Sequence, residues 1–195
     1  LNATAYFNKL SEEGLFFTNC FTPHFSTARG LFALITGIPD VQLSKFSTRN
    51  PLALNQQTII NSFEDYSKMY FIGGNPAFNN FEGLIKNINN VKIFTEKDFS
   101  SPKLNVWGIS DKNLFRESNK IFKTQTAPFF AIVQTSNNHR PFMIPKEDAN
   151  MSFTNYSLDT LQHYGFESEQ EYKSFVYSDY CIQEFIEQAK KEDYF

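Results

Sequence analysis

Residues 128–142 read PFFAIVQTSNNHRPF, in which an apolar run passes directly into a polar one. The apolar part, residues 129–134, is typical of a central strand covered on both faces, because a half-exposed strand alternates apolar and polar residues. The polar part then lies at the carboxyl end of that strand, where open α/β sheets bind their ligands. His139 and Arg140 are in this loop beside two asparagines. That setting favours oxyanion binding or general acid catalysis by the histidine.

Strands and helices alternate along the rest of the chain. Residues 68–72 and 91–94 have the composition of short strands, and residues 16–21 are predicted to be a strand or an extended segment. Helices are expected over residues 3–15, 31–38, 57–66, 114–123 (with its N-cap within 110–113) and 168–191, the last opened by a capping box of Ser168 and Glu171. This alternation predicts an α/β fold with a mixed, mostly parallel sheet flanked by helices, and residues 1–195 are expected to form one domain or a large part of one.

The composition limits the class of function. The 195 residues include 23 Phe and 9 Tyr, which predicts a core built on aromatic rings, with some rings left for sugar or lipid-headgroup contacts. A formal net charge of −3 and the lack of a basic run argue against nucleic-acid binding. Cys20 and Cys181 match no metal-binding spacing, and two free thiols fit the sequence as well as one disulfide. No apolar run approaches the ~18 residues of a membrane-spanning helix.

Residues 22–39 read TPHFSTARGLFALITGIP and contain the most informative hydroxyls of the chain. Ser26 and Thr27 stand between a proline-containing turn and an apolar run, which places one of them at or near a helix N-terminus. There, free N–H groups and the helix dipole favour anions. Arg29 adds a planar cation that suits phosphate or sulfate oxygens. The combination indicates a nucleophile held for attack on a tetrahedral oxyanion. Taken alone, an ordinary Ser/Thr N-cap is the commoner explanation.

A second polar group follows the predicted strand 68–72. Gly73 and Gly74 allow close approach of the backbone to a ligand, although a tight turn explains them as well. Asn79 and Asn80 come soon after them and are expected to bind substrate.

Three other residues with reactive or aromatic side chains have ordinary structural explanations. Indole packing accounts for Trp107, and helix capping accounts for Asp111. His24 lies beside the candidate nucleophiles but is expected to be an exposed loop histidine.

Four segments in their order along the chain resemble one family. They read TPHFSTARGLFALITGIP, YFIGGNPAFNN, WGISDKNLF and PFFAIVQTSNNHRPF. Together they are similar to the sulfatase-like catalytic domain of lipoteichoic acid synthases and membrane-linked phosphoglycerol transferases, which belong to the alkaline phosphatase superfamily. The similarity runs through nearly the whole chain, and the order and spacing of the segments make it specific.

The resemblance implies a role for each candidate residue. Thr27 would be the nucleophile and a ligand of a divalent cation, manganese or magnesium; Ser26 stays open as an alternative nucleophile. The threonine would attack the phosphorus of a phosphatidylglycerol-like donor and release diacylglycerol, and the glycerophosphoryl group would pass to a growing polymer or glycan. His139 would contact the transferring phosphate. Arg29 and Arg140 are expected to bind substrate together with the two asparagines.

The sequence also departs from the family's pattern. The family's metal site takes a glutamate from a strand before residue 1 and an Asp-His pair from a GDHG-like motif after residue 195. Thr27 alone cannot hold a divalent ion, because an open catalytic site needs about three protein ligands. We therefore expect part of a larger enzyme whose membrane anchor precedes Leu1 and whose catalytic domain lies outside the cytoplasm of a bacterium. The isolated piece is expected to be inactive, with an incomplete sheet whose edges favour self-association.

Two alternatives to phosphoglycerol transfer remain open. A sulfatase needs a formylglycine made from a Cys or Ser four residues before an arginine, but Phe25 stands four residues before Arg29. A non-catalytic homologue that binds a glycan or lipid headgroup through its aromatic residues is the second. In addition, Asn79 and Phe81 stand where lipoteichoic acid synthases have Trp and Arg, so another phosphoglycerol or phosphoethanolamine donor, or a sulfate ester, is also open.

Overall fold

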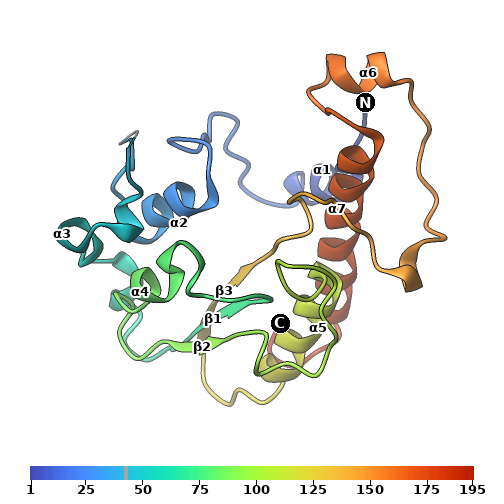
Figure 1. Cartoon of the computed structure of the whole chain (residues 1–195). Coiled ribbons are helices and arrows are strands. Elements are labelled where there is room, and N and C mark those ends of the chain that lie inside the picture. Colours follow the sequence, from blue (N-terminus) through green and yellow to red (C-terminus); the bar gives the residue numbers. More distant parts are fainter. Residues whose placement is uncertain (42–43) are drawn as a thin grey trace.

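A small parallel sheet lies at the centre of the molecule. The computed structural model describes residues 1–41 and 44–195. Strand β1 (Ser67–Ile72) lies between β2 (Lys92–Phe94) and β3 (Phe129–Gln134), and both pairs are parallel (Figure 1). In the register of β1 and β3, Ile72 is paired with Gln134. The two carboxyl ends are therefore level, and the loops that follow them start side by side.

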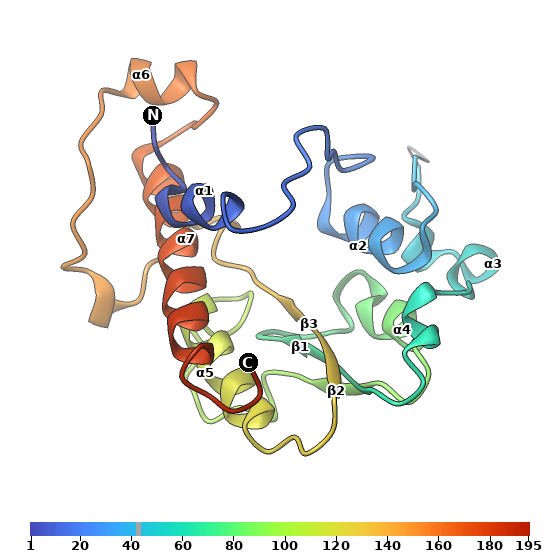
Figure 2. The ribbon, with the colours of Figure 1, turned by 180° about the vertical axis from the view of Figure 1, so that it is seen from behind.

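Helices pack on both faces of this sheet (Figures 1 and 2). On one face α2 (Thr27–Thr36) and α4 (Phe81–Ile85) enclose a core with Tyr70 and Ile72 of β1. On the other face Met69 and Phe71 pack against α5 (Asp111–Phe122), whose neighbour is α7 (Glu169–Ala189). The remaining helices are short: α1 (Ala5–Ser11), α3 (Pro51–Leu54) and α6 (Leu158–His163), with the 3-10 turns η1 (Ser47–Arg49), η2 (Ile59–Ser62), η3 (Phe78–Asn80) and η4 (Lys146–Asp148). The predicted α/β class with a mostly parallel sheet is confirmed.

The central strand is β1, and the prediction that residues 129–134 form a central strand is wrong for the described chain. Tyr70 and Phe71 of β1 are fully buried, whereas every residue of β3 is only partly buried. The apolar run in β3 has another cause. Phe130 and Ile132 pack against the core on the α2 side, while Phe129, Ala131 and Val133 pack against the core on the α5 side. A continuous apolar run shows that both faces of a strand are covered, but it does not show whether the strand has a neighbouring strand on each side.

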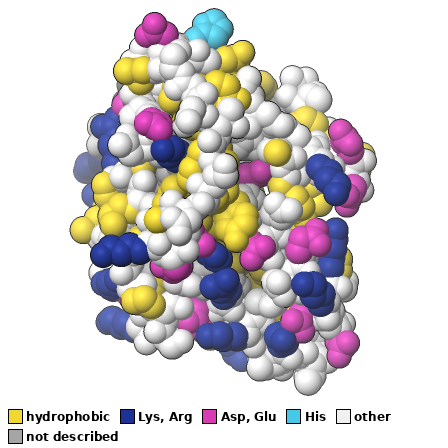
Figure 3. All heavy atoms as spheres, turned by 90° about the vertical axis from the view of Figure 1, so that its right-hand side faces the viewer, with side chains coloured by type: hydrophobic (Ala, Val, Ile, Leu, Met, Phe, Trp, Pro, Cys, Tyr) yellow, Lys and Arg dark blue, Asp and Glu magenta, His cyan; other side chains and the backbone are white. Residues whose placement is uncertain are grey.

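The two ends of the chain are joined through Asp179 of α7. Its carboxylate accepts hydrogen bonds from the backbone N–H groups of Tyr6 (2.8 Å) and Phe7 (2.9 Å), in the first turn of α1. The N-terminal helix therefore lies against α7, as both ribbon views show (Figure 2). Charged side chains of both signs are interspersed over the side of the molecule that Figure 3 presents.

The local predictions had mixed outcomes. Residues 57–66 form only the 3-10 turn η2, and residues 16–21 form no strand and leave Phe16, Phe17 and Phe21 exposed. Helix α7 begins as predicted: the Ser168 hydroxyl accepts a hydrogen bond from the Glu171 N–H at 3.1 Å. Cys20 and Cys181 are both free thiols, so the disulfide alternative is excluded.

Candidate functional site

A cavity of about 1050 Å³ opens at the carboxyl ends of β1 and β3. Three of the segments that line it are far apart in the sequence and contain predicted site residues. They are the start of α2 with Ser26 and Thr27, the loop after β1 with Asn79, and the loop after β3 with His139. Because the register brings the two strand ends level, the polar loops that the sequence singled out converge on one site.

Thr27 is the first residue of α2, and the helix starts in an unusual way. Ser26, at the N-cap position, has φ 102° and ψ 125°, and its side chain makes no capping hydrogen bond. A positive φ at a non-glycine residue is strained, and such strain gathers at functional sites. The helix is closed instead by the Ser26 carbonyl, which accepts from the N–H groups of Arg29 and Gly30, both at 3.1 Å. The ordinary N-cap explanation of Ser26 is therefore wrong, and both hydroxyls line the cavity.

His139 reaches the cavity from the loop after β3. Its backbone N–H donates to the Ser136 carbonyl at 3.0 Å, and its Nδ1 lies 3.1 Å from the Arg140 carbonyl oxygen. The imidazole packs on the indole of Trp107, with ring centroids 3.8 Å apart.

Asp111, the first residue of α5, fixes the loop that carries His139 through hydrogen bonds to its backbone. The Asp111 carboxylate accepts from the N–H groups of Ser136 (2.7 Å) and Asn137 (3.1 Å), and the Asp111 N–H donates to Asn137 Oδ1 at 2.6 Å. Asp111 is 1% exposed, and this burial raises the pKa of its carboxyl despite the hydrogen bonds. The N-cap of α5 is Ser110, so the sequence explanation of Asp111 as the cap is wrong: it positions the site loop instead.

Replacing Asp111 with asparagine should make stability less dependent on pH. Asparagine keeps an oxygen acceptor for the two N–H groups but cannot ionise. Burial raises the folded-state pKa of Asp111, so ionisation of this carboxyl favours unfolding. The contribution of Asp111 to the free energy of unfolding is therefore fully present below the unfolded pKa of about 3.9, and it is lost as the pH rises through the folded pKa. In urea unfolding across this range, the free energy of unfolding of wild type minus that of the variant should fall with pH. A constant or rising difference would contradict this. The variant Asp111→Ala, which also loses the acceptor, should be less stable at every pH.

The two arginines that were predicted to bind substrate lie outside the cavity lining. Arg29 is 3% exposed and its guanidinium lies 5.1 Å from the Phe46 ring centroid. Two helical residues span about 200°, so Arg29 and Thr27 face opposite sides of α2. The Arg140 side chain is 70% exposed and forms an ion pair with Glu167.

Asn79 and Asn80 differ although they are neighbours. Asn79 lines the cavity, whereas Asn80 donates through Nδ2 to the Thr48 carbonyl at 2.6 Å. The structure thus brings Thr27, Asn79 and His139 together and places Asn80 with the two arginines outside the lining. The roles of all six in catalysis and binding stay predictions.

Arg49 is the cation that the sequence analysis missed. It ends the 3-10 turn η1, is exposed and lines the cavity, with its guanidinium 5.8 Å from the Phe46 ring centroid. The turn is fixed by the buried carboxylate of Asp40, which accepts from the Ser47 N–H at 2.9 Å. In the sequence Arg49 stands in a polar loop without periodicity, and the fold alone brings it to the site.

The described residues do not complete a metal site. Within residues 1–41 and 44–195 no group of three or more His, Cys, Asp or Glu side chains is arranged to hold an ion. The cavity itself offers the Thr27 hydroxyl and the His139 imidazole, and its described lining contains no carboxylate. An open catalytic metal site takes about three protein ligands. Metal binding by Thr27 therefore stays a prediction that needs further ligands.

Within residues 1–41 and 44–195, no helix is both long and apolar enough to cross a membrane.

Comparison with known proteins agrees with this architecture. Over residues 1–195 the chain matches the family model described as Sulfatase. It is 26% identical over 144 residues to the lipoteichoic acid synthase of Staphylococcus saprophyticus (73% of this chain, 20% of that protein). It is 25% identical over 199 residues to lipoteichoic acid synthase 1 of Bacillus subtilis (96% of this chain, 30% of that protein). The chain thus spans less than a third of these curated relatives.

The fold is shared with a solved structure. A protein of the alkaline phosphatase superfamily from Vibrio parahaemolyticus superposes with a TM-score of 0.81 at 25% identity, covering 100% of this chain and 46% of that one. The resemblance drawn from the four sequence segments is confirmed. The family model matches the whole chain, and the chain therefore belongs to the sulfatase family.

Proposed function

We propose that the chain is part of a metal-dependent enzyme that transfers a phosphoglycerol, or a related phosphoalcohol, from a phospholipid through a threonine-linked intermediate. The observation that carries the proposal is the convergence of Thr27, Asn79 and His139 on one cavity from three separate segments. The names of the curated relatives support this substrate class. We also propose that the complete protein is anchored in a bacterial membrane, with this domain on the extracytoplasmic side.

The cavity residues suit a two-step displacement. The Thr27 oxygen loses its proton to water and bonds to phosphorus, while the bond from phosphorus to the diacylglycerol oxygen breaks. His139 as an imidazolium gives the departing oxygen a proton. An acceptor hydroxyl then attacks phosphorus and passes its proton to the neutral imidazole. The bond from phosphorus to the Thr27 oxygen breaks, and that oxygen regains a proton from water. The positive end of α2 favours the anionic phosphate in both steps. The proposed metal dependence is supported by the membership of the chain in the sulfatase family.

The lining of the cavity favours a neutral, hydroxylated headgroup. Asn75, Asn79, Asn138 and Gln134 contribute amides, which donate and accept as alcohol hydroxyls do. Among the described lining residues Arg49 is the one Lys, Arg, Asp or Glu, and its guanidinium suits the phosphate. An ethanolamine ammonium would lack a carboxylate partner there. We therefore propose glycerol phosphate ahead of ethanolamine phosphate.

Sulfate ester hydrolysis is the weaker candidate. Phe25 stands where the formylglycine precursor would be, and it is 82% exposed at the cavity. A phenyl ring supplies no nucleophile, so the machinery of a formylglycine sulfatase is not in place.

A donor panel tests the proposal. The complete protein with manganese is given vesicles of fluorescent phosphatidylglycerol, vesicles of fluorescent phosphatidylethanolamine, and an aryl sulfate in separate reactions. We expect diacylglycerol release from phosphatidylglycerol to be fastest and aryl sulfate to be turned over negligibly. Residues 1–195 alone should hydrolyse bis-p-nitrophenyl phosphate negligibly. Turnover of the sulfate without cleavage of phosphatidylglycerol would overturn the proposal.

A further inference from the structure

We propose that Trp107 is a positioning residue for His139, holding the imidazole in the orientation in which it meets the transferring phosphate. The inference rests on the proposed function for its catalytic consequence, but the contact itself does not depend on that function. The two rings are 3.8 Å apart between centroids at an interplanar angle of 41°. The indole Nε1 also donates to the Arg140 carbonyl at 2.6 Å. One side chain thus contacts both the imidazole and the backbone that follows it.

The backbone of Trp107 is itself fixed by close packing against the loop after β1. Gly108 has φ 121°, and a Cβ there would lie 1.9 Å from the Gly73 carbonyl oxygen. A Cβ on Gly74 would lie 2.2 Å from the Trp107 carbonyl oxygen. Only glycines allow this approach, which the hydrogen bond from the Ile109 N–H to Gly73 O (3.0 Å) closes. Gly73 and Gly74, which the sequence analysis explained as a ligand contact or a tight turn, therefore fix the position of the Trp107 backbone.

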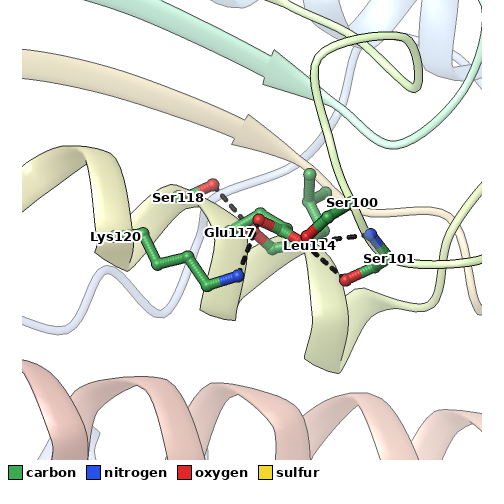
Figure 4. Close-up of polar contacts among 6 residues, drawn as sticks. All are labelled: Ser100, Ser101, Leu114, Glu117, Ser118 and Lys120. Atoms are coloured by element: carbon green, nitrogen blue, oxygen red, sulfur yellow. Dashed lines mark hydrogen bonds and ion pairs between the residues drawn. The ribbon is translucent and has the colours of Figure 1, made fainter.

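The segment that leads to Trp107 is anchored at its other end by Glu117 of α5 (Figure 4). The buried carboxylate accepts from the hydroxyls of Ser100 (2.9 Å) and Ser101 (2.6 Å) and pairs with Lys120 at 3.0 Å. Burial opposes its ionisation, but these hydrogen bonds prevail and lower the pKa of Glu117. Trp107 thus stands on a segment that is held at both ends.

A purely structural role does not account for where the indole lies. Trp107 is only partly buried and lines the cavity, and its indole makes a T-shaped contact with the Phe78 ring at a centroid distance of 5.2 Å. His139, in contrast, is on a polar loop and is otherwise held at its ring by the contact of Nδ1 with the Arg140 carbonyl. Removing the indole should leave the imidazole free to turn. Misplacement of a reacting group by about 1 Å costs on the order of 100-fold in rate.

The test measures the ring contact and the catalysis separately in the complete protein. A protonated imidazole in contact with an indole quenches its fluorescence. The emission difference between wild type and Trp107→Phe should therefore fall as the pH is lowered, and His139→Gln should abolish that dependence. In the donor assay, Trp107→Leu should lower kcat by about 10-fold or more with little change in KM, and Trp107→Phe should recover most of the loss. Phe175→Leu, the same kind of change on α7 away from the cavity, should leave kcat unchanged.

The outcomes separate the two proposals. An emission difference that does not respond to His139→Gln, or an unchanged kcat in Trp107→Leu, overturns the positioning role. A raised KM at constant kcat also overturns it, because the indole would then bind the substrate itself. If the quenching is present and no phosphodiester donor is turned over, the proposed function fails while the contact stands. If Trp107→Leu does not fold, the pH dependence of the emission difference in Trp107→Phe and its loss in His139→Gln still decide whether the indole holds the imidazole.

Discussion

Replacing Thr27 with alanine in the complete protein should lower the rate of phosphoglycerol transfer by more than about 1000-fold, as loss of a catalytic nucleophile does in other covalent enzymes. Thr27 is exposed at the first position of α2 and lines the cavity with His139. Alanine favours the helix and removes only the hydroxyl and a methyl group, so the fold should be kept. Release of diacylglycerol from phosphatidylglycerol vesicles measures the effect, and circular dichroism checks the fold.

Ser26 is the matched control, because its hydroxyl lines the same cavity one residue earlier. Ser26→Ala should reduce transfer far less than Thr27→Ala does. Acid quenching during turnover should leave the glycerophosphoryl group on the peptide that contains Thr27. Tandem mass spectrometry of that peptide then shows whether the group is on Ser26 or on Thr27. If Ser26→Ala abolishes transfer while Thr27→Ala retains it, the nucleophile is Ser26 and the assignment to Thr27 is wrong.

Elements with local signals could be predicted from the sequence. Helices α5 and α7 have Ser110 and Ser168 at their N-cap positions, and the hydroxyls of these serines accept the capping hydrogen bonds. The helix expected over residues 57–66 was wrong because tertiary contacts compete with it. Asn61 donates through Nδ2 to the Asn87 carbonyl at 3.0 Å and accepts from the Asn89 N–H at 2.8 Å, which fixes the segment as a short turn. Such partners lie more than twenty residues away and leave no periodic pattern.

The site shows the same division. Thr27, Asn79 and His139 could be predicted to meet because each follows or precedes an element whose direction the pattern fixes. Arg49 could not, since its position depends on the packing of the turn η1 against α2, which leaves no periodic pattern in the sequence. Arg29 was attractive for its spacing from Thr27, but helical geometry turns it into the core beside Phe46.

Removing the carboxylate of Asp148 should destabilise the protein by about 3–5 kcal/mol, the largest stability effect that we expect, because it leaves a buried ammonium group unpaired. Asp148 ends the turn η4 and pairs with Lys112 of α5, and both side chains are almost fully buried. Its second oxygen accepts from the Tyr177 hydroxyl at 2.8 Å. Burial alone would lower the pKa of Lys112, but the contact with Asp148 outweighs this and raises it. Urea unfolding of wild type and Asp148→Ala measures the loss.

The effect is large because Asp148 connects η4 to Lys112 of α5 and to Tyr177 of α7. A matched set of variants separates the energy of the ion pair from the cost of burying either charge alone. Lys112→Met leaves Asp148 bonded to Tyr177 and should cost less than Asp148→Ala. The double variant Lys112→Met/Asp148→Leu buries no charge and should be close to wild type in stability or above it. A loss below about 1 kcal/mol in Asp148→Ala would mean that water reaches Lys112 and that the pair is an ordinary surface contact. Because α5 also carries Asp111, which holds the His139 loop, loosening its first turn should lower transfer activity before the protein unfolds.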